Sequence, residues 1–67
     1  MRLGELIAVT REARGLTLRE LEKRTGVSNA LISQIETGTI ESPGFWTVMK
    51  LARELDLNLK RLAQCGP

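Results

Sequence analysis

The glycine at position 26 places the strongest constraint on this chain, because it separates two segments in which apolar residues recur at helical spacing. Glycine readily takes the positive φ that a tight turn after a helix requires. The flanking segments, residues 16–25 and 28–36, are each the length of a short helix. Gly26 therefore predicts two short helices joined by a tight turn, which is a helix-turn-helix.

Both segments carry signals for the start of a helix. Thr17 is followed three residues later by Glu20, the pattern of a capping box in which each side chain satisfies a backbone N–H group. We therefore expect the first helix of the pair to begin at Leu18. Ser28 is a good N-cap for the second helix, whose buried stripe is predicted to contain Ile32 and Ile35.

The rest of the chain also favours helices. Residues 3–14 have apolar residues at helical spacing, and Gly15 ends that segment. Residues 36–44 lack this periodicity and contain Gly and Pro, which predicts a loop. A fourth helix is expected from near Pro43 to near Asp56. Its predicted apolar face consists of Phe45, Val48, Leu51, Ala52 and Leu55.

A last short helix is expected after Asn58, before Gly66 and Pro67 close the chain. No segment alternates as a strand would. The 67 residues, with 42% hydrophobic content, support one core, so we expect a single all-α domain over residues 1–67. A chain of this length buries only about 60% of its unfolded surface, so dimerisation would add stability.

Several classes of protein are excluded by composition. With 27% charged residues, no long apolar run and no leader-like start, the chain predicts neither a membrane span nor a secretory signal, which favours a cytoplasmic location. A single cysteine, Cys65, and no histidine argue against an internal disulfide and a zinc site. There is no nucleophile beside a base and no phosphate-cradling glycine loop, so we expect no enzyme, cofactor or metal.

From about Leu6 to Ala63 the chain resembles a helix-turn-helix domain of the Xre family, the class of the Cro and lambda-type phage repressors. The residues that carry the resemblance are Arg11, Arg14-Gly15-Leu16-Thr17, Glu20-Leu21, Gly26-Val27-Ser28, Ile32-Ser33, Ile35-Glu36, Gly38, Pro43, Leu51-Ala52 and Leu55. The resemblance implies a compact five-helix bundle of the lambda repressor-like type, with the helix-turn-helix at about residues 17–37. Its third helix, about Ser28 to Thr37, would lie in the major groove of double-stranded DNA.

The resemblance places the base-reading positions at Asn29, Ala30 and Gln34, with Ser33 on the same face. Asn and Gln amides can each make a bidentate pair with adenine, and an Ala methyl can contact the thymine methyl. The alternative is that Asn29 and Gln34 are ordinary solvated side chains on an exposed face.

Contacts to the DNA backbone are expected where helix N-termini and hydroxyl groups suit a phosphate. By resemblance the N-termini are at Leu18, Ser28, and Gly44 with Phe45; Thr37 and Thr39 add hydroxyl donors, and Arg19 adds a basic side chain. The basic residues Arg11, Arg14, Arg19, Lys23 and Arg24 are the charges best placed to help. Arg11 and Glu36 also match a pair that forms an internal salt bridge in family members; the alternative is two separate solvated charges.

The chain departs from the family pattern at three places. Leu18 stands where a glutamine is common, and Glu22 stands where a small alanine is common, so its carboxylate must be solvated or paired. Thr39, Ile40 and Glu41 replace a basic residue of the loop. With a net charge of only +2, a monomer is expected to bind DNA weakly and with a shallow salt dependence; a dimer would compensate.

The leading hypothesis is a sequence-specific repressor that binds a palindromic operator as a homodimer. The expected dimer contacts are Trp46, Leu57, Leu59 and Leu62. The competing hypothesis is a protein-interaction module, such as an antitoxin or anti-repressor-like partner of a second regulatory protein. Its support is an apolar patch of Leu18, Ile40 and Trp46.

Overall fold

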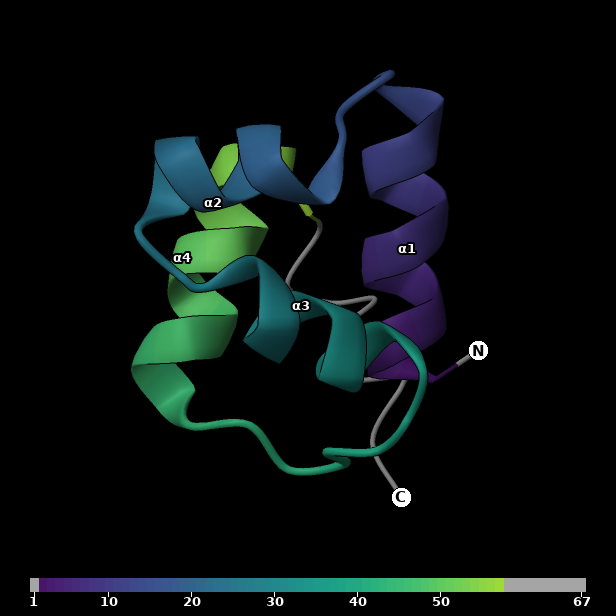
Figure 1. Ribbon diagram of the computed structural model, residues 1–67. Coiled ribbons are helices and arrows are strands. Elements are labelled where there is room, and N and C mark those ends of the chain that lie inside the picture. The colour runs from purple at the N-terminus through teal and green to yellow at the C-terminus, as the bar shows by residue number, and fades with distance from the viewer. Residues whose placement is uncertain (1, 58–67) are drawn as a thin grey trace.

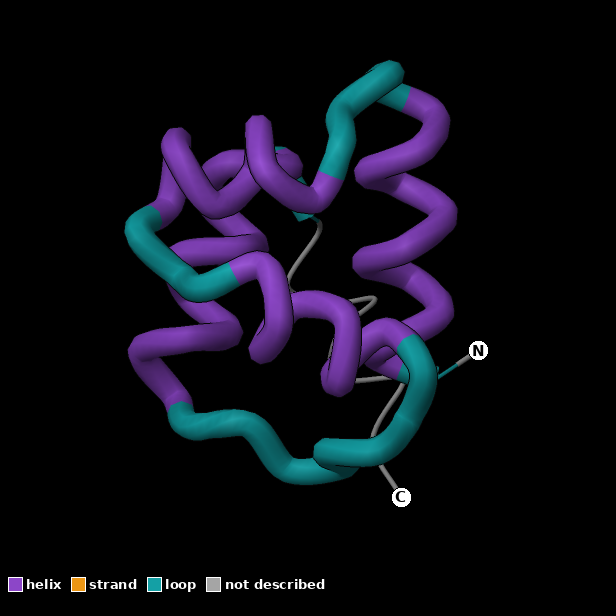
Figure 2. The backbone as a smooth tube through the Cα atoms, viewed as in Figure 1, coloured by secondary structure: helices purple, strands orange, loops and turns teal. Residues whose placement is uncertain are grey.

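The computed structural model describes residues 2–57, which form four α-helices and no strand (Figures 1 and 2). The helices are α1 (Leu3–Ala13), α2 (Leu18–Thr25), α3 (Asn29–Glu36) and α4 (Phe45–Leu55). All four were expected from the sequence, with bounds that differ by at most two residues. The expected fifth helix after Asn58 lies outside the described residues, so the five-helix count is replaced by four for this part of the chain.

The four helices enclose one apolar core. α3 packs against α1 and α2, and α4 packs against the same two helices from the other side (Figure 1). Each helix contributes one buried stripe, and fully burying a Leu or Ile side chain contributes about 1.5–3 kcal/mol. None of the described helices has both the length and the apolar character needed to cross a membrane. The core residues are Ile7, Leu16, Leu21, Val27, Ile32, Ile35, Leu51 and Leu55.

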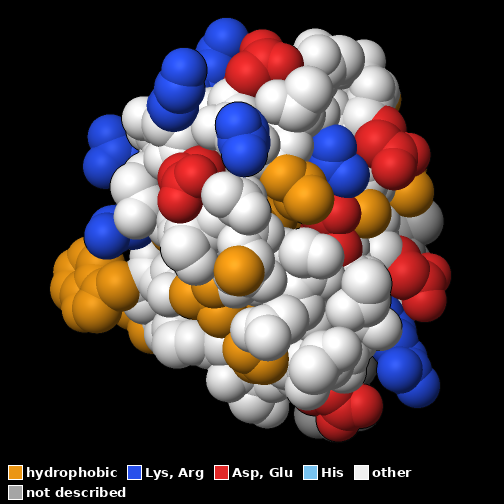
Figure 3. Space-filling model, viewed as in Figure 1, with side chains coloured by type: hydrophobic (Ala, Val, Ile, Leu, Met, Phe, Trp, Pro, Cys, Tyr) orange, Lys and Arg blue, Asp and Glu red, His pale blue; other side chains and the backbone are white. Residues whose placement is uncertain are grey.

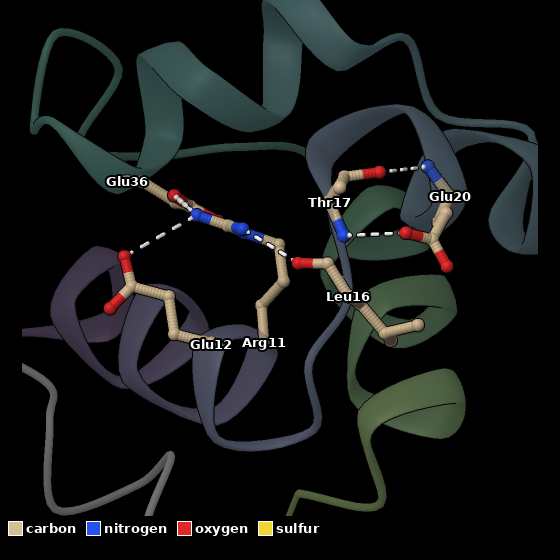
Figure 4. Close-up of polar contacts among 6 residues, drawn as sticks. All are labelled: Arg11, Glu12, Leu16, Thr17, Glu20 and Glu36. Atoms are coloured by element: carbon tan, nitrogen blue, oxygen red, sulfur yellow. Dashed lines mark hydrogen bonds and ion pairs between the residues drawn. The ribbon is translucent and has the colours of Figure 1, made fainter.

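The start of α2 has the predicted capping box. The Thr17 Oγ1 atom accepts a hydrogen bond from the Glu20 backbone N–H at 3.1 Å, and the Glu20 carboxylate accepts one from the Thr17 N–H at 3.2 Å (Figure 4). α2 therefore begins at Leu18, as expected. It ends at Gly26, whose φ of 78° and ψ of 1° lie in the left-handed region.

A threonine that the sequence analysis did not single out holds the turn between α2 and α3. The Thr25 hydroxyl donates to the Leu21 carbonyl at 2.7 Å and accepts from the Val27 N–H at 3.1 Å. Ser28 then caps α3 as predicted, with its Oγ atom accepting from the Leu31 N–H at 3.1 Å. The Thr25 and Ser28 side chains thus pair the N–H groups of Val27 and Leu31, which neither helix can pair.

The start of α4 differs from the prediction. The helix begins at Phe45 rather than near Pro43, with Gly44 as N-cap, and it ends at Leu55 next to Asp56. Phe45 was expected on the apolar face, but 68% of it is exposed. Its helical spacing is correct, but the first turn of α4 lies at the edge of the molecule, where no other described helix covers it (Figure 1).

The start of α1 lies directly against the end of α3. A Cβ atom added to Gly4 would overlap the carbonyl oxygen of Ile35 and would meet the Cα atom of Glu36 at 3.2 Å. The obstructing atoms belong to the backbone, so no side-chain rotation can relieve the overlap. The two helices approach this closely because residue 4 has no side chain.

We expect Gly4→Ala to lower the free energy of unfolding by about 1–3 kcal/mol, because the backbones must move apart. Urea unfolding followed by circular dichroism measures this loss. Gly44→Ala is the matched control: nothing lies within 4 Å of its added Cβ, and an N-cap Gly to Ala change costs less than about 1 kcal/mol. A gain in stability for Gly4→Ala, as helix propensity alone predicts, would contradict the close approach.

Candidate nucleic-acid interface

α3 presents one polar face to solvent. The helix crosses the front of the bundle in Figure 1, and the surface over it in Figure 3 consists mainly of uncharged side chains. Residues four apart share a side of a helix, so the buried Ile32 and Ile35 leave the opposite side free. The residues of this outer face are Asn29 and Ser33, which are partly exposed, and Ala30, Gln34 and Thr37, which are exposed. The structure therefore brings the four predicted base-reading residues together on one surface.

Asn29 is held by a residue of the preceding helix. Its side-chain Nδ2 donates to the Glu22 Oε1 atom at 2.8 Å, and both residues are partly buried. A carboxylate acceptor makes this bond stronger than one between neutral groups. Glu22, which had to be solvated or paired, is thus paired with one of the predicted base-reading residues.

The guanidinium of Arg11 ties α1 to the end of α3 (Figure 4). Its Nε and Nη2 atoms donate to the two oxygens of Glu36 at 2.8 and 3.0 Å, and Nη1 donates to the Leu16 carbonyl at 2.8 Å. Only 13% and 9% of the Arg11 and Glu36 side chains are exposed. Glu12 adds a longer contact to Arg11 at 3.7 Å.

These contacts settle which role Arg11 can take. Its hydrogen bond to Glu36 raises the pKa of the Arg11 guanidinium, and the nearby carboxylates of Glu36 and Glu12 act in the same direction, against burial. The positive charge of Arg11 is therefore neutralised by Glu36 within the domain. The sequence also placed Arg11 among the basic residues that could help to bind DNA; because its side chain is mostly buried and paired, it is not available for that role.

The remaining basic residues are unevenly placed. In Figure 3 most of the visible Lys and Arg side chains lie at the upper left, over α2, with acidic side chains among them, and one lies at the lower right; further acidic side chains line the right, over α1. Arg14, Arg19 and Lys23 are exposed, and none of the three pairs with a carboxylate among residues 2–57. Arg24 is turned toward α4, with Nη1 at 3.3 Å from the Glu54 carboxylate.

The loop after α3 and the start of α4 flank the polar face. The hydroxyls of Thr37 and Thr39, both exposed, lie 3.1 Å apart and hydrogen-bond to each other. The N-terminus of α4 at Gly44 has no side-chain cap. Backbone N–H groups at such an end suit an anion.

The predicted apolar patch is only partly present. Leu18 and Ile40 are half-buried and pack against the core. Trp46, by contrast, is 74% exposed and meets Phe45 edge to face, with ring centroids 5.3 Å apart and planes at 80°. A hydrophobic protrusion marks the start of α4 at the left of Figure 3.

The other residues expected at a dimer interface are Leu57, Leu59 and Leu62. Leu57 is half-buried and packs against the core of its own chain. Leu59 and Leu62 lie outside the described residues. Among residues 2–57, no three Asp, Glu, His or Cys side chains come together as the ligands of a metal ion would.

A tight glycine turn between two short helices, with the second helix exposing a polar face, defines a helix-turn-helix domain. The family described as helix-turn-helix domain matches residues 2–64, and the chain belongs to this family. The chain is also similar to an uncharacterized HTH-type transcriptional regulator of Sinorhizobium fredii, with 43% identity over 57 residues. That alignment covers 85% of this chain but 29% of the relative's length. No solved structure matches the chain.

Removing one partner of the Arg11–Glu36 pair is expected to destabilise the domain severely. Glu36→Gln leaves a largely buried guanidinium without its counter-charge, which costs about 3–5 kcal/mol. In a double-mutant cycle read by thermal and urea unfolding, Arg11→Met with Glu36→Gln should lose less stability than the two single changes added together. Additive losses would mean that the two side chains do not act as a pair.

Proposed function

We propose that residues 1–67 form the DNA-binding domain of a transcriptional regulator of the Xre type, to which Cro and lambda-type repressors belong. The observation that carries this proposal is the outer face of α3, where Asn29, Ser33 and Gln34 stand on a helix anchored by the core and by Glu36. Membership of the helix-turn-helix family and similarity to a protein named as a transcriptional regulator support it. In this proposal α3 enters the major groove of double-stranded DNA and α2 crosses the backbone.

Sequence reading is assigned to four side chains of α3. The amides of Asn29 and Gln34 are chemically suited to adenine, where one bidentate pair discriminates by about 1–3 kcal/mol. Ala30 offers a methyl group to thymine, and Ser33 offers a hydroxyl between them. The exposed surfaces of Ala30 and Gln34 support direct contact.

Binding to the phosphates is assigned to residues around this face. Arg19 and Lys23 are exposed basic side chains of α2, and the uncapped N-terminus of α4 at Gly44 and Phe45 offers backbone N–H groups. Ser28, Thr37 and Thr39 offer neutral hydroxyl groups near the two ends of α3. Leu18 keeps only its main chain for this purpose, since its side chain packs on the core.

We further propose that the domain acts as a repressor and binds a palindromic operator as a homodimer. The few free basic residues favour two half-sites over one, and the exposed Phe45–Trp46 pair is the most apolar described surface available for self-association. A two-fold dimer would hold its two α3 helices about 34 Å apart, one turn of DNA.

The first test is selection from a random duplex pool at about 0.15 M salt. The wild type is expected to enrich a two-fold motif, and Asn29→Ala with Gln34→Ala is expected to lose or relax it, because the bidentate base contacts disappear. Arg53→Gln, an exposed change on α4, serves as the control and should retain the motif. Failure of the wild type to enrich any motif would overturn direct readout by α3.

A second candidate function, a module that binds another protein, is favoured by the 74% exposure of Trp46. Two variants separate the candidates. Arg19→Gln with Lys23→Gln should weaken DNA binding equally for all sequences and reduce the slope of log affinity against log salt by about 2 for each bound subunit, since each lost phosphate contact contributes about 0.9. Trp46→Ser should leave this slope per subunit unchanged and convert a dimer to monomer in sedimentation.

The two functions and the homodimer are tested by different results. If Arg19 and Lys23 have no effect on DNA affinity while Trp46→Ser abolishes capture of a protein ligand, the protein-binding function replaces the DNA-binding one. If the wild type sediments as a monomer at every concentration tested, the homodimer proposal is wrong.

A further inference from the structure

The hydrogen bond between Asn29 and Glu22 crosses the turn of the helix-turn-helix. Glu22 is on α2 and Asn29 is the first residue of α3, so each side chain is fixed by a different helix. The Nδ2 to Oε1 distance is 2.8 Å, and neither residue is fully exposed. Glu22, which holds the Asn29 side chain, therefore belongs to α2 and not to the outer face of α3.

The chemistry of the two groups determines which way the Asn29 amide points. Turning an amide over exchanges its oxygen and nitrogen, and so exchanges acceptor and donor. An ionised carboxylate can only accept hydrogen bonds. Of the two orientations, only the one with Nδ2 toward Glu22 makes the bond, so the carboxylate selects a single order of donor and acceptor.

The same bond sets what remains for a base. The Asn29 amide has two N–H donors and one oxygen, and Glu22 takes one donor. When Glu22 accepts the N–H that points away from Oδ1, the other N–H and Oδ1 stay side by side, which matches the N7 acceptor and N6 donor of adenine. Guanine offers two acceptors, N7 and O6, and an amide with a single donor left cannot satisfy both.

We propose that Glu22 is a positioning residue that sets the preference of Asn29 for adenine over guanine. The inference rests on the proposed function, because it takes Asn29 to be a base-reading residue. It assigns opposite effects to one carboxylate: Glu22 sharpens the choice of base, and its negative charge opposes binding to phosphates of any sequence. A merely structural role would not produce that combination.

The test begins without DNA. The chain has four side-chain amides, those of Asn29, Gln34, Asn58 and Gln64, so their NMR signals can be assigned. Glu22→Ala is expected to shift one proton of the Asn29 NH₂ pair upfield as its hydrogen bond is lost, and to leave the Gln34 pair in place. An unchanged Asn29 pair would overturn the anchoring of the amide.

The second arm compares binding to two DNA duplexes. One carries the motif that the wild type selects; the other has guanine in place of adenine at the position where the Asn29→Ala variant loses its base preference. The wild type should discriminate by about 5- to 150-fold, the ratio that one bidentate pair provides. Glu22→Ala should reduce that ratio, because the freed amide keeps two donors and can also serve guanine, and it should bind random duplex at least as tightly as the wild type. Adding Glu22→Ala to Asn29→Ala should produce no further loss of discrimination.

Glu41→Gln is the control, because it removes an exposed carboxylate of the loop that contacts Arg2 and not Asn29. It should leave the ratio unchanged. If Glu22→Ala retains the preference that Asn29→Ala abolishes, the positioning role is wrong while base reading by Asn29 stands. If Asn29→Ala relaxes no base pair, base reading and the positioning role fall together, even where NMR shows the bond.

Discussion

The three-way contact of Arg11 is the interaction on which the arrangement of helices depends. Its guanidinium donates hydrogen bonds to both carboxylate oxygens of Glu36 and to the carbonyl of Leu16. One side chain therefore joins α1, the end of α3 and the residue before the N-cap of α2. A largely buried charge is tolerated only with partners in good geometry. The close approach of Gly4 to Ile35 is a second contact between α1 and the end of α3. Contacts on the inner side of α3 therefore determine the direction in which its outer face points.

Local signals were sufficient to predict most of the fold. The capping box of Thr17 and Glu20, the left-handed Gly26 and the N-cap Ser28 each act within four residues, so the sequence carries them directly. The periodicity of α1 and α4 then placed the buried stripes. The four predicted base-reading positions followed from the family resemblance, and the structure brings their side chains to one face.

Features that depend on contact between distant segments were not predictable in this way. Spacing alone could not decide whether Arg11 and Glu36 form a pair, because they are 25 positions apart in the chain; only the resemblance paired them. The link from Glu22 to Asn29 needed the angle between α2 and α3. Phe45 was assigned to the core because periodicity carries no information about where a core ends. The close approach of Gly4 to the backbone of α3 likewise depends on residues that are far apart in the chain.

The exposed position of Trp46 has a consequence for observing this molecule. It is the only tryptophan of the chain, and it stands at the edge of the bundle beside Phe45. Most small domains carry their indole in the interior, where its fluorescence reports folding. Here the indole faces water in the folded chain, so its emission colour is insensitive to the state of the core. The Trp46 fluorescence instead reports whether the start of α4 is covered, so association at this surface can be followed without an added label.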